Sequence, residues 1–257
     1  MSKYEDISVK LEKGVVRITI ERQARLNAFR DQTADELLDA FRWADAAAEA
    51  RAIILTGAGR AFGAGYDLST IRPDETPELD RVLERHFNPL IREMRATRLP
   101  IVCQVNGPCA GAAVGVALAG DIVIAARSAY FYEPFVGIAL VPDAGNTLFL
   151  SRLIGRARAA PMMMLGDRVS AEEALGWGLI WRVYEDAELP AEADKIAATL
   201  ASRAPAALAA TKRLIAAASD FAIDAQLDLE RDLQGVAGRT PEMKQAIAAF
   251  FAARKGV

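Results

Sequence analysis

Three short, unbroken apolar runs constrain the fold of this chain more than any other feature. They are RAIILTG at 51–57, PIVCQVNG at 100–107 and GDIVIAA at 120–126. A strand that is apolar at nearly every position has both faces covered, as in a parallel sheet with helices on each side. Each run also follows a segment that can form a helix, and the order strand, helix, strand implies right-handed crossovers. The sequence therefore predicts an α/β protein.

The N-terminal part of the chain carries two further local signals. The segment ISVKLEKGVVRITIE alternates in polarity around Lys13-Gly14, which indicates a β-hairpin. A helix is predicted over 31–47, with Asp31 as its N-cap and apolar residues at helical spacing, namely Leu37, Leu38, Phe41 and Ala44. A strand pair and a helix thus precede the first apolar run.

The last third of the chain changes to Ala-rich helical patterns. Ser170 and Glu173 have the spacing of a capping box, and WRVYE is typical of a short strand. From Pro190 onward we expect three or four helices and no strand. This predicts a core domain at 1–190 and a helical region at 191–257. The final helix is expected to pack against a neighbouring subunit through one apolar stripe, formed by Met243, Ala246, Ile247 and Phe250.

Composition excludes several classes of function. The net charge of −3 argues against a broad nucleic-acid surface, which needs clustered positive charge. Only two cysteines and one histidine occur, Cys103, Cys109 and His86, so neither a disulfide framework nor a zinc site is expected. The first residues lack a signal-peptide pattern, and no apolar stretch reaches membrane-spanning length. We expect a cytoplasmic protein with a small-molecule substrate and no membrane partner.

Two segments rich in small residues carry the chemical information. GRAFGAGYDL at 59–68 follows a predicted strand, and Gly63 and Gly65 let a ligand approach the backbone, where the N–H of Tyr66 can donate. VNGPCAGAAVGVALAGD at 105–121 predicts a strand end followed by a helix whose first N–H groups suit an anion. When each segment is taken alone, a flexible turn is the alternative explanation for the first and tight helix packing is the alternative for the second.

Taken together, these motifs resemble the crotonase superfamily over almost the whole chain. The resemblance rests on ERQARLNAF, AFGAGYDL, VNGPCAGAAVG, GDIVIAA and LVPDAGNT, in this order. It implies an α/β fold with a spiral of ββα units, a C-terminal helical region for trimerisation, often a dimer of trimers, and an acyl-CoA thioester as substrate. It also implies an oxyanion hole formed by the backbone N–H groups of Tyr66 and of Ala112, which follows Gly111.

The same resemblance implies contacts with the substrate. Coenzyme A contacts fall on the backbone of Arg25, Leu26, Ala64, Asp67 and Leu68, and Gly111 is a further expected contact with the substrate. Arg25 is expected either to meet a phosphate or to be an ordinary exposed charge. Walls of the acyl pocket are expected at Phe87 and Phe135, with His86 or Asn88 as further candidates, although aromatic residues are more often part of a core.

The resemblance also identifies the catalytic acid. Family hydratases use two glutamates, and the matching positions here are Gly115 and Phe135. Glu133 is close to the second of these, and we expect it to be a satisfied polar contact or a rim residue. Asp143 alone would be interpreted as a cap of its turn or of the next helix. Family members that move double bonds place an acid at this position, so Asp143 is the catalytic candidate, with a pKa raised by partial desolvation.

A finer resemblance favours one branch of the superfamily. RHFNPLIR, GDIVIAARSAYF, GRARA and DAQLDLERDLQGVAGRT resemble isomerases that convert ring-1,2-epoxyphenylacetyl-CoA to oxepin-CoA and shift a 3,4 double bond of an enoyl-CoA to the 2,3 position. This chemistry implies no metal and no redox cofactor, because coenzyme A is part of the substrate. Two alternatives remain open: an enoyl-CoA hydratase, and a non-catalytic or RNA-binding homologue.

Overall fold

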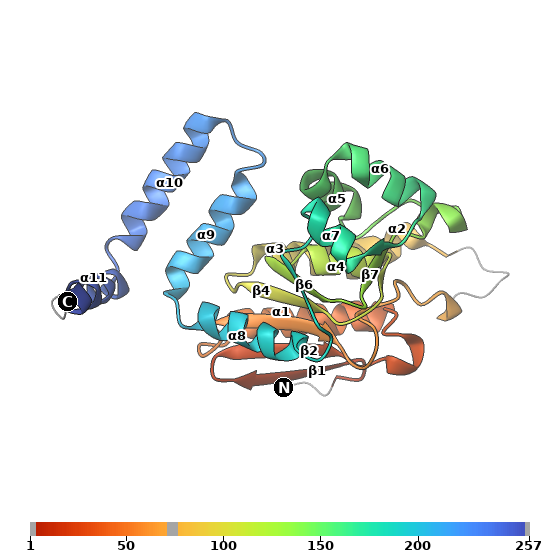
Figure 1. Ribbon diagram of the computed structural model, residues 1–257, viewed down its shortest axis with the longest axis horizontal. Helices are drawn as coiled ribbons and strands as arrows, with labels where there is room; N and C mark the ends of the chain where they lie inside the picture. Colours follow the sequence, from red (N-terminus) through yellow and green to blue (C-terminus); the bar gives the residue numbers. More distant parts are fainter. Residues whose placement is uncertain (1–3, 71–76, 255–257) are drawn as a thin grey trace. The chain divides into compact units, whose positions relative to one another are not determined.

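The three apolar runs form neighbouring parallel strands in the computed structural model, which describes residues 4–70 and 77–254 (Figure 1). They are β3 (Ala52–Gly57), β4 (Ile101–Val105) and β6 (Ile122–Ala126). On one side β3 pairs in parallel with β2 (Val15–Ile20), and on the other β6 pairs in parallel with β9 (Arg182–Tyr184). Strand β1 (Ile7–Glu12) completes the six-stranded sheet as an antiparallel edge. The predicted α/β fold with a buried parallel sheet is confirmed.

The predicted hairpin at Lys13-Gly14 joins β1 to β2. Both turn residues have a positive φ, 49° for Lys13 and 81° for Gly14, as a two-residue turn between antiparallel strands requires. Along β2, Val16, Ile18 and Ile20 are buried, so the polar alternation seen in the sequence places one face of the strand in the core.

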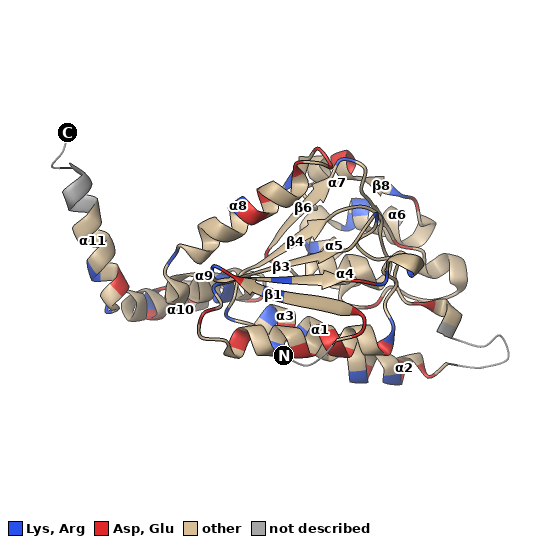
Figure 2. Ribbon diagram, turned by 90° about the horizontal axis from the view of Figure 1, so that it is seen from below, with Lys and Arg blue, Asp and Glu red and all other residues tan. Residues whose placement is uncertain are grey.

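Helices cover both faces of this sheet. Figures 1 and 2 show α1 (Asp31–Ala46) and α3 (Asn88–Ala96) on one face and α8 (Leu189–Ala201) along the other. The predicted apolar positions of α1 are buried, and Figure 2 shows its acidic residues on the side away from the strands. The N-cap is Arg30, however, and not Asp31, which is the first helical residue. The helix begins there because the Arg30 N–H donates to Thr33 Oγ1 (3.1 Å).

A second, three-stranded sheet lies beside the first. It contains β5 (Cys109–Ala110), β7 (Tyr130–Tyr132) and β8 (Val169–Ser170). The accompanying helices are α4 (Ala112–Leu118), α5 (Asn146–Ile154), α6 (Arg156–Leu165) and α7 (Ala171–Trp177). The predicted capping box opens α7, because Ser170 Oγ accepts from the Glu173 N–H (3.2 Å) while the Glu173 carboxylate accepts from the Ser170 N–H (2.9 Å).

Short helical turns connect these elements. They are η1 (Gln23–Arg25), η2 (Leu68–Thr70), α2 (Leu79–Val82), the π-helical turn η3 (Leu83–Phe87) and η4 (Phe135–Ile138). The last four contribute side chains to the cavity described below. Within the described ranges, no helix combines the length and the apolar character needed to cross a membrane.

The chain divides into two compact units, residues 1–201 and 202–257. The second unit contains α9 (Pro205–Ala217), α10 (Ile223–Ala237) and α11 (Pro241–Arg254), and no strand occurs in its described part. The division was predicted after residue 190, which lies at the start of α8, whereas the observed division follows the end of α8. This helix precedes the observed division, since it contacts β3, β4 and β6 of the sheet. The predicted stripe of the final helix lies on α11, where the Phe250 side chain is outside the described residues.

Glu133 is a completely buried carboxyl group. Glu133, which follows β7, has no exposed surface, and both of its carboxyl oxygens lack a hydrogen-bond partner among the described residues. The prediction that Glu133 is a satisfied polar contact or a rim residue is therefore wrong. Burial, together with the nearby charge of Asp143, raises the pKa of Glu133 to about 9, so that the group is protonated at neutral pH.

We expect Glu133→Gln to stabilise the protein at neutral pH. The unfolded chain has the ordinary pKa of 4.5 at this position, so the contribution of Glu133 to stability is fully present below pH 4.5 and is lost as pH rises toward about 9. At pH 7 the variant should gain on the order of 3 kcal/mol in free energy of unfolding. Denaturant unfolding at several pH values would test this. Equal stabilities at pH 7, or a difference that persists at pH 4, would contradict the expectation.

Candidate active site

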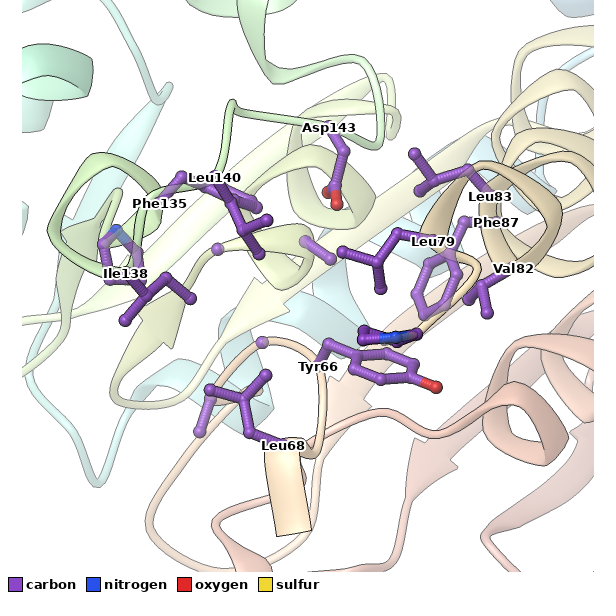
Figure 3. Close-up of a pocket in the computed structure, with 16 residues that line it drawn as sticks. Tyr66, Leu68, Leu79, Val82, Leu83, Phe87, Phe135, Ile138, Leu140 and Asp143 are labelled. Carbon is purple, nitrogen blue, oxygen red and sulfur yellow. The ribbon is translucent and has the colours of Figure 1, made fainter. Parts of the chain in front are cut away.

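An apolar cavity of about 350 Å³ opens where the two sheets meet. Asp143 is the only acidic residue among its lining residues in the described part of the chain. Figure 3 shows its carboxylate projecting into the space between Leu140 and Leu79. Most of the wall is formed by hydrophobic side chains, namely Leu68, Leu79, Val82, Leu83, Phe87, Phe135, Ile138 and Leu140.

The two glycine-containing segments run side by side along the cavity. Gly63 and Cys109 form a parallel bridge, and the Ala110 N–H donates to Gly63 O (2.9 Å). Further along, a Cβ on Gly65 would lie 3.2 Å from Ala110 O, so glycine permits this close approach of the two backbones. Tyr66 and Ala112 follow at equivalent positions of the two segments, and both line the cavity. The structure brings the two predicted oxyanion donors together, and their donor role remains a prediction.

The helix after the second segment is shorter than its sequence suggests. Strand β5 intervenes after Asn106-Gly107, and α4 begins only at Ala112 and has seven residues. A helix of two turns has a small dipole, so the dipole of α4 contributes little to the expected binding of an anion. As the first helical residue, Ala112 has no partner for its N–H within α4. Any contribution of α4 to oxyanion binding therefore depends on this individual N–H group.

Asp143 stands at the start of a tight turn that leads into α5. The carbonyl oxygen of Asp143 accepts from the Asn146 N–H (2.9 Å), and Ala144 and Gly145 both have positive φ, 49° and 84°. Gly145 is the N-cap of α5, and no side chain caps this helix. The alternative prediction that Asp143 caps the helix is therefore wrong. Its Oδ1 is buried and lacks a hydrogen-bond partner among the described residues.

The surroundings separate the pKa values of two neighbouring carboxyl groups. Burial raises the pKa of Asp143 to about 6, although its own backbone N–H partly opposes this shift. The pKa of Glu133 is raised further, to about 9, by burial and by the charge of Asp143. Near neutral pH, Asp143 is therefore ionised while Glu133 keeps its proton. A carboxylate with a pKa close to neutrality is suited to accepting a proton and returning it.

Neither position of the two family glutamates carries an acid. A Cβ on Gly115 would lie 2.3 Å from the carbonyl oxygen of Ala144, so a side chain there would displace the turn that bears Asp143. The second position is Phe135, which is buried and lines the cavity. The structure thus has no room for the first carboxylate and has an apolar wall in place of the second.

An aromatic pair closes one side of the cavity. The rings of Tyr66 and Phe87 meet edge to face, with centroids 5.9 Å apart, and the Tyr66 hydroxyl donates to Asp31 Oδ1 (2.9 Å). Phe87 belongs to the π-helical turn η3, and such turns are often found at functional sites. Its neighbours His86 and Asn88 do not line the cavity, contrary to expectation, and His86 Nδ1 lies 2.7 Å from Asp35 Oδ1 on α1.

The predicted coenzyme A contacts are only partly gathered at this site. Ala64 and Leu68 line the cavity, whereas Arg25, Leu26 and Asp67 do not. Asp67 is buried and paired with Arg22 (2.9 Å), and its N–H donates to Phe29 O (2.7 Å). Arg25 is exposed at the end of η1. The roles of these residues in holding coenzyme A remain predictions.

The sequence interpretation missed most of the apolar wall. Leu79, Val82 and Leu83 face the cavity from α2 and η3, ahead of Phe87 (Figure 3). Their spacing of three and four residues in LDRVLERHF is a helical signal that could have identified them. Ile138 ends the short 3₁₀ turn η4 and Leu140 follows it, and the segment is too short for a periodic pattern to mark either residue.

Across residues 4–70 and 77–254, no group of three or more His, Cys, Asp or Glu side chains is arranged to hold a metal ion. Cys103 and Cys109 are buried free thiols.

Comparison with known proteins gives one consistent result. The family described as enoyl-CoA hydratase/isomerase matches residues 10–257. A 1,2-epoxyphenylacetyl-CoA isomerase of Escherichia coli K12 is 42% identical over 253 residues, with 97% of each chain covered. A short-chain-enoyl-CoA hydratase of Clostridium acetobutylicum is 33% identical, with 97% of this chain and 96% of that one covered.

Solved structures agree with the sequence comparison. The crystal structure of an enoyl-CoA hydratase from Bacillus anthracis superimposes with a TM-score of 0.92 at 30% identity, covering 97% of each chain. The predicted resemblance and the predicted fold are both confirmed. The chain belongs to the enoyl-CoA hydratase/isomerase family of the crotonase superfamily.

Proposed function

We propose that this protein is an acyl-CoA isomerase in which Asp143 is the only acid-base group. The observation that carries the proposal is a single, half-buried carboxylate in an apolar cavity, with Oδ1 of Asp143 shielded from solvent, beside the backbone of Tyr66 and Ala112. Asp143 removes a proton from the carbon next to the thioester carbonyl, and the electron pair moves onto the carbonyl oxygen. The N–H groups of Tyr66 and Ala112 stabilise that oxygen, and one such donor contributes roughly 10²–10³ in rate.

The same carboxyl group then returns the proton at another carbon. In a 3-enoyl-CoA, loss of the proton at carbon 2 and its return at carbon 4 move the double bond to the 2,3 position. No atom is gained or lost, and Asp143 ends the cycle ionised as it began. The proposed chemistry moves a proton without net oxidation or reduction, so it requires neither a metal nor a redox cofactor. Coenzyme A arrives as part of the substrate.

Two observations favour isomerisation over hydration. Water addition needs one group to activate the water and a second to protonate carbon. The positions of the family glutamates are Gly115 and Phe135, and the carbonyl of Ala144 occupies the space beside Gly115. The other nearby acid, Glu133, does not line the cavity.

The lining of the cavity supports an acyl group that is aromatic or otherwise apolar. Tyr66, Phe87 and Phe135 provide aromatic surface, and polar side chains are few. The relative from Escherichia coli is a 1,2-epoxyphenylacetyl-CoA isomerase, and its 42% identity extends along the chain. We therefore infer that the substrates are ring-1,2-epoxyphenylacetyl-CoA, converted to oxepin-CoA, and 3-enoyl-CoA, converted to 2-enoyl-CoA.

We also propose that the protein assembles as a homotrimer or as a dimer of trimers, as crotonases do. Large apolar side chains are exposed in the second unit, which a soluble monomer would rarely leave in contact with water. They include Ile215, Phe221, Ile223, Leu227, Val236, Met243 and Ile247.

Asp143→Asn should abolish isomerisation while leaving ligand binding almost intact. The amide has nearly the same shape but cannot accept the proton, so kcat for 3-enoyl-CoA and for epoxyphenylacetyl-CoA should fall about 10²–10⁴-fold. Isothermal titration with a saturated acyl-CoA should show a similar Kd for both proteins. Asp186→Asn, which changes an exposed carboxylate bonded to the Ser128 N–H, is the matched control. Retained turnover in Asp143→Asn, or rapid hydration of crotonyl-CoA by the wild type, would contradict the proposal.

The rate should depend on pH through the same group. Burial raises the pKa of Asp143 to about 6, and only the ionised form accepts a proton. We expect kcat/KM to rise with pH, to pass its half-maximum near pH 6 and then to level off. Initial rates in buffers of constant ionic strength measure this profile. A half-maximum near pH 4 would mean that the base is an ordinary, solvated carboxylate.

The oligomeric state can be measured directly. Light scattering coupled to size exclusion should give a mass of a trimer, or of twice a trimer. Phe221→Glu with Ile223→Glu should lower that mass, because charge is then placed on the exposed apolar surface of the second unit. Lys195→Glu, on the exposed side of α8, controls for a change in charge alone. A monomeric wild type would refute this part of the proposal.

A further inference from the structure

Asn146 is a completely buried polar residue next to the cavity, and it has no part in the reaction proposed above. It has no exposed surface, and its Nδ2 donates to the carbonyl oxygen of Gly111 (3.0 Å). A carbonyl oxygen only accepts hydrogen bonds, so the donor end of the amide must face Gly111. The opposite end, Oδ1, is buried and lacks a partner among the described residues.

The backbone of the same residue is tied to the catalytic turn. The Asn146 N–H donates to the carbonyl oxygen of Asp143 (2.9 Å). Asn146 therefore connects two parts of the site that are distant in sequence. One is the turn that carries the acid, and the other is the peptide group between Gly111 and Ala112.

That peptide group contains the predicted oxyanion donor. The C=O of Gly111 and the N–H of Ala112 belong to one rigid plane, so the direction of the carbonyl fixes the direction of the N–H. Gly111 has φ 55° and ψ −129°, a conformation in which glycine leaves the peptide plane easily rotated. A donor on the carbonyl side limits this rotation and also polarises the peptide, which strengthens its N–H as a donor.

We propose that Asn146 is a positioning residue that aims the Ala112 N–H at the thioester oxygen while holding the Asp143 turn at a fixed place beside it. The inference rests on the proposed function, because it assumes that Ala112 donates to the enolate oxygen. Val114 N–H also donates to Gly111 O (2.9 Å), but this bond lies within the first turn of α4 and does not connect it to Asp143.

A role in packing alone does not explain the residue. An asparagine that only filled space would leave its Oδ1 unpaired inside the protein, and a buried unpaired acceptor is destabilising. An apolar side chain would fill the same space without that cost. Asparagine differs from such an apolar residue in providing an N–H donor directed at the carbonyl oxygen of Gly111.

Two substitutions separate positioning from packing. Asn146→Leu fills the site with an apolar group, and Asn146→Ala removes the amide without adding bulk. Both should lower kcat about tenfold, less than the roughly hundredfold or greater effect of losing an oxyanion donor itself, and KM should change by less than about twofold. Asn146→Leu should melt at a temperature equal to or above that of Asn146→Ala, yet be no more active. If kcat instead follows the melting temperature across the variants, the inference is wrong.

A remote variant controls for the loss of a buried hydrogen bond. Thr97 is buried at the end of α3, where its Oγ1 donates to Asp45 Oδ1 (2.6 Å), far in the sequence from the site. Thr97→Val should lower the melting temperature and leave kcat unchanged. The kcat values of the wild type, of Thr97→Val and of the Asn146 variants are compared at a temperature well below every melting transition.

A spectroscopic measurement distinguishes this inference from the proposed function. A conjugated aromatic enoyl-CoA absorbs at longer wavelength when its carbonyl is polarised, whatever reaction follows. The wild type should shift this maximum to the red, and Asn146→Ala should shift it less at saturating ligand. An unchanged shift in Asn146→Ala overturns the positioning role and leaves the proposed function standing. The absence of any shift in the wild type overturns both.

Discussion

The close packing of the Asp143 turn on α4 is the constraint on which the site depends. Only a hydrogen atom at position 115 allows the carbonyl of Ala144 to rest there, since a Cβ would lie 2.3 Å from it. This contact brings the turn down beside Ala112 and leaves Asp143 facing the cavity. A glutamate at position 115 and an aspartate at position 143 therefore compete for the same space. The absence of an acid at position 115 and the placement of Asp143 at the cavity are linked by this packing contact.

The apolar wall gives that one acid its chemical properties. Leu79, Leu83 and Leu140 surround the carboxylate with surface that cannot solvate a charge, and burial moves its pKa to about 6. The same low polarity strengthens any hydrogen bond from the backbone to a developing oxyanion. A more polar wall would lower the pKa of Asp143 and, in the proposed reaction, would weaken the stabilisation of the enolate at the same time.

Local sequence patterns predicted the fold well and the site only in part. The apolar runs, the hairpin at Lys13-Gly14 and the Ser170 capping box depend on neighbouring residues, and all three are confirmed. The N-cap at Asp31 was wrong by one residue, because Thr33 satisfies the backbone of Arg30 instead. Glu133 was misjudged for a different reason: its burial is produced by segments distant in the sequence, which no local pattern reveals.

Buried polar groups without partners, which lower the stability of a protein, gather around the turn that carries Asp143. Buried side-chain oxygens without a hydrogen-bond partner occur on Glu133, Asp143 and Asn146, and elsewhere in the described residues only on Asn27 and Gln226. Solvating the Asp143 carboxylate would stabilise the protein, but it would return the pKa toward 3.8 and remove a base matched to neutral pH. The unpaired polar groups around this turn are thus a consequence of the same burial that raises the pKa of the carboxylate. Natural proteins often accept local cost at functional sites in this way.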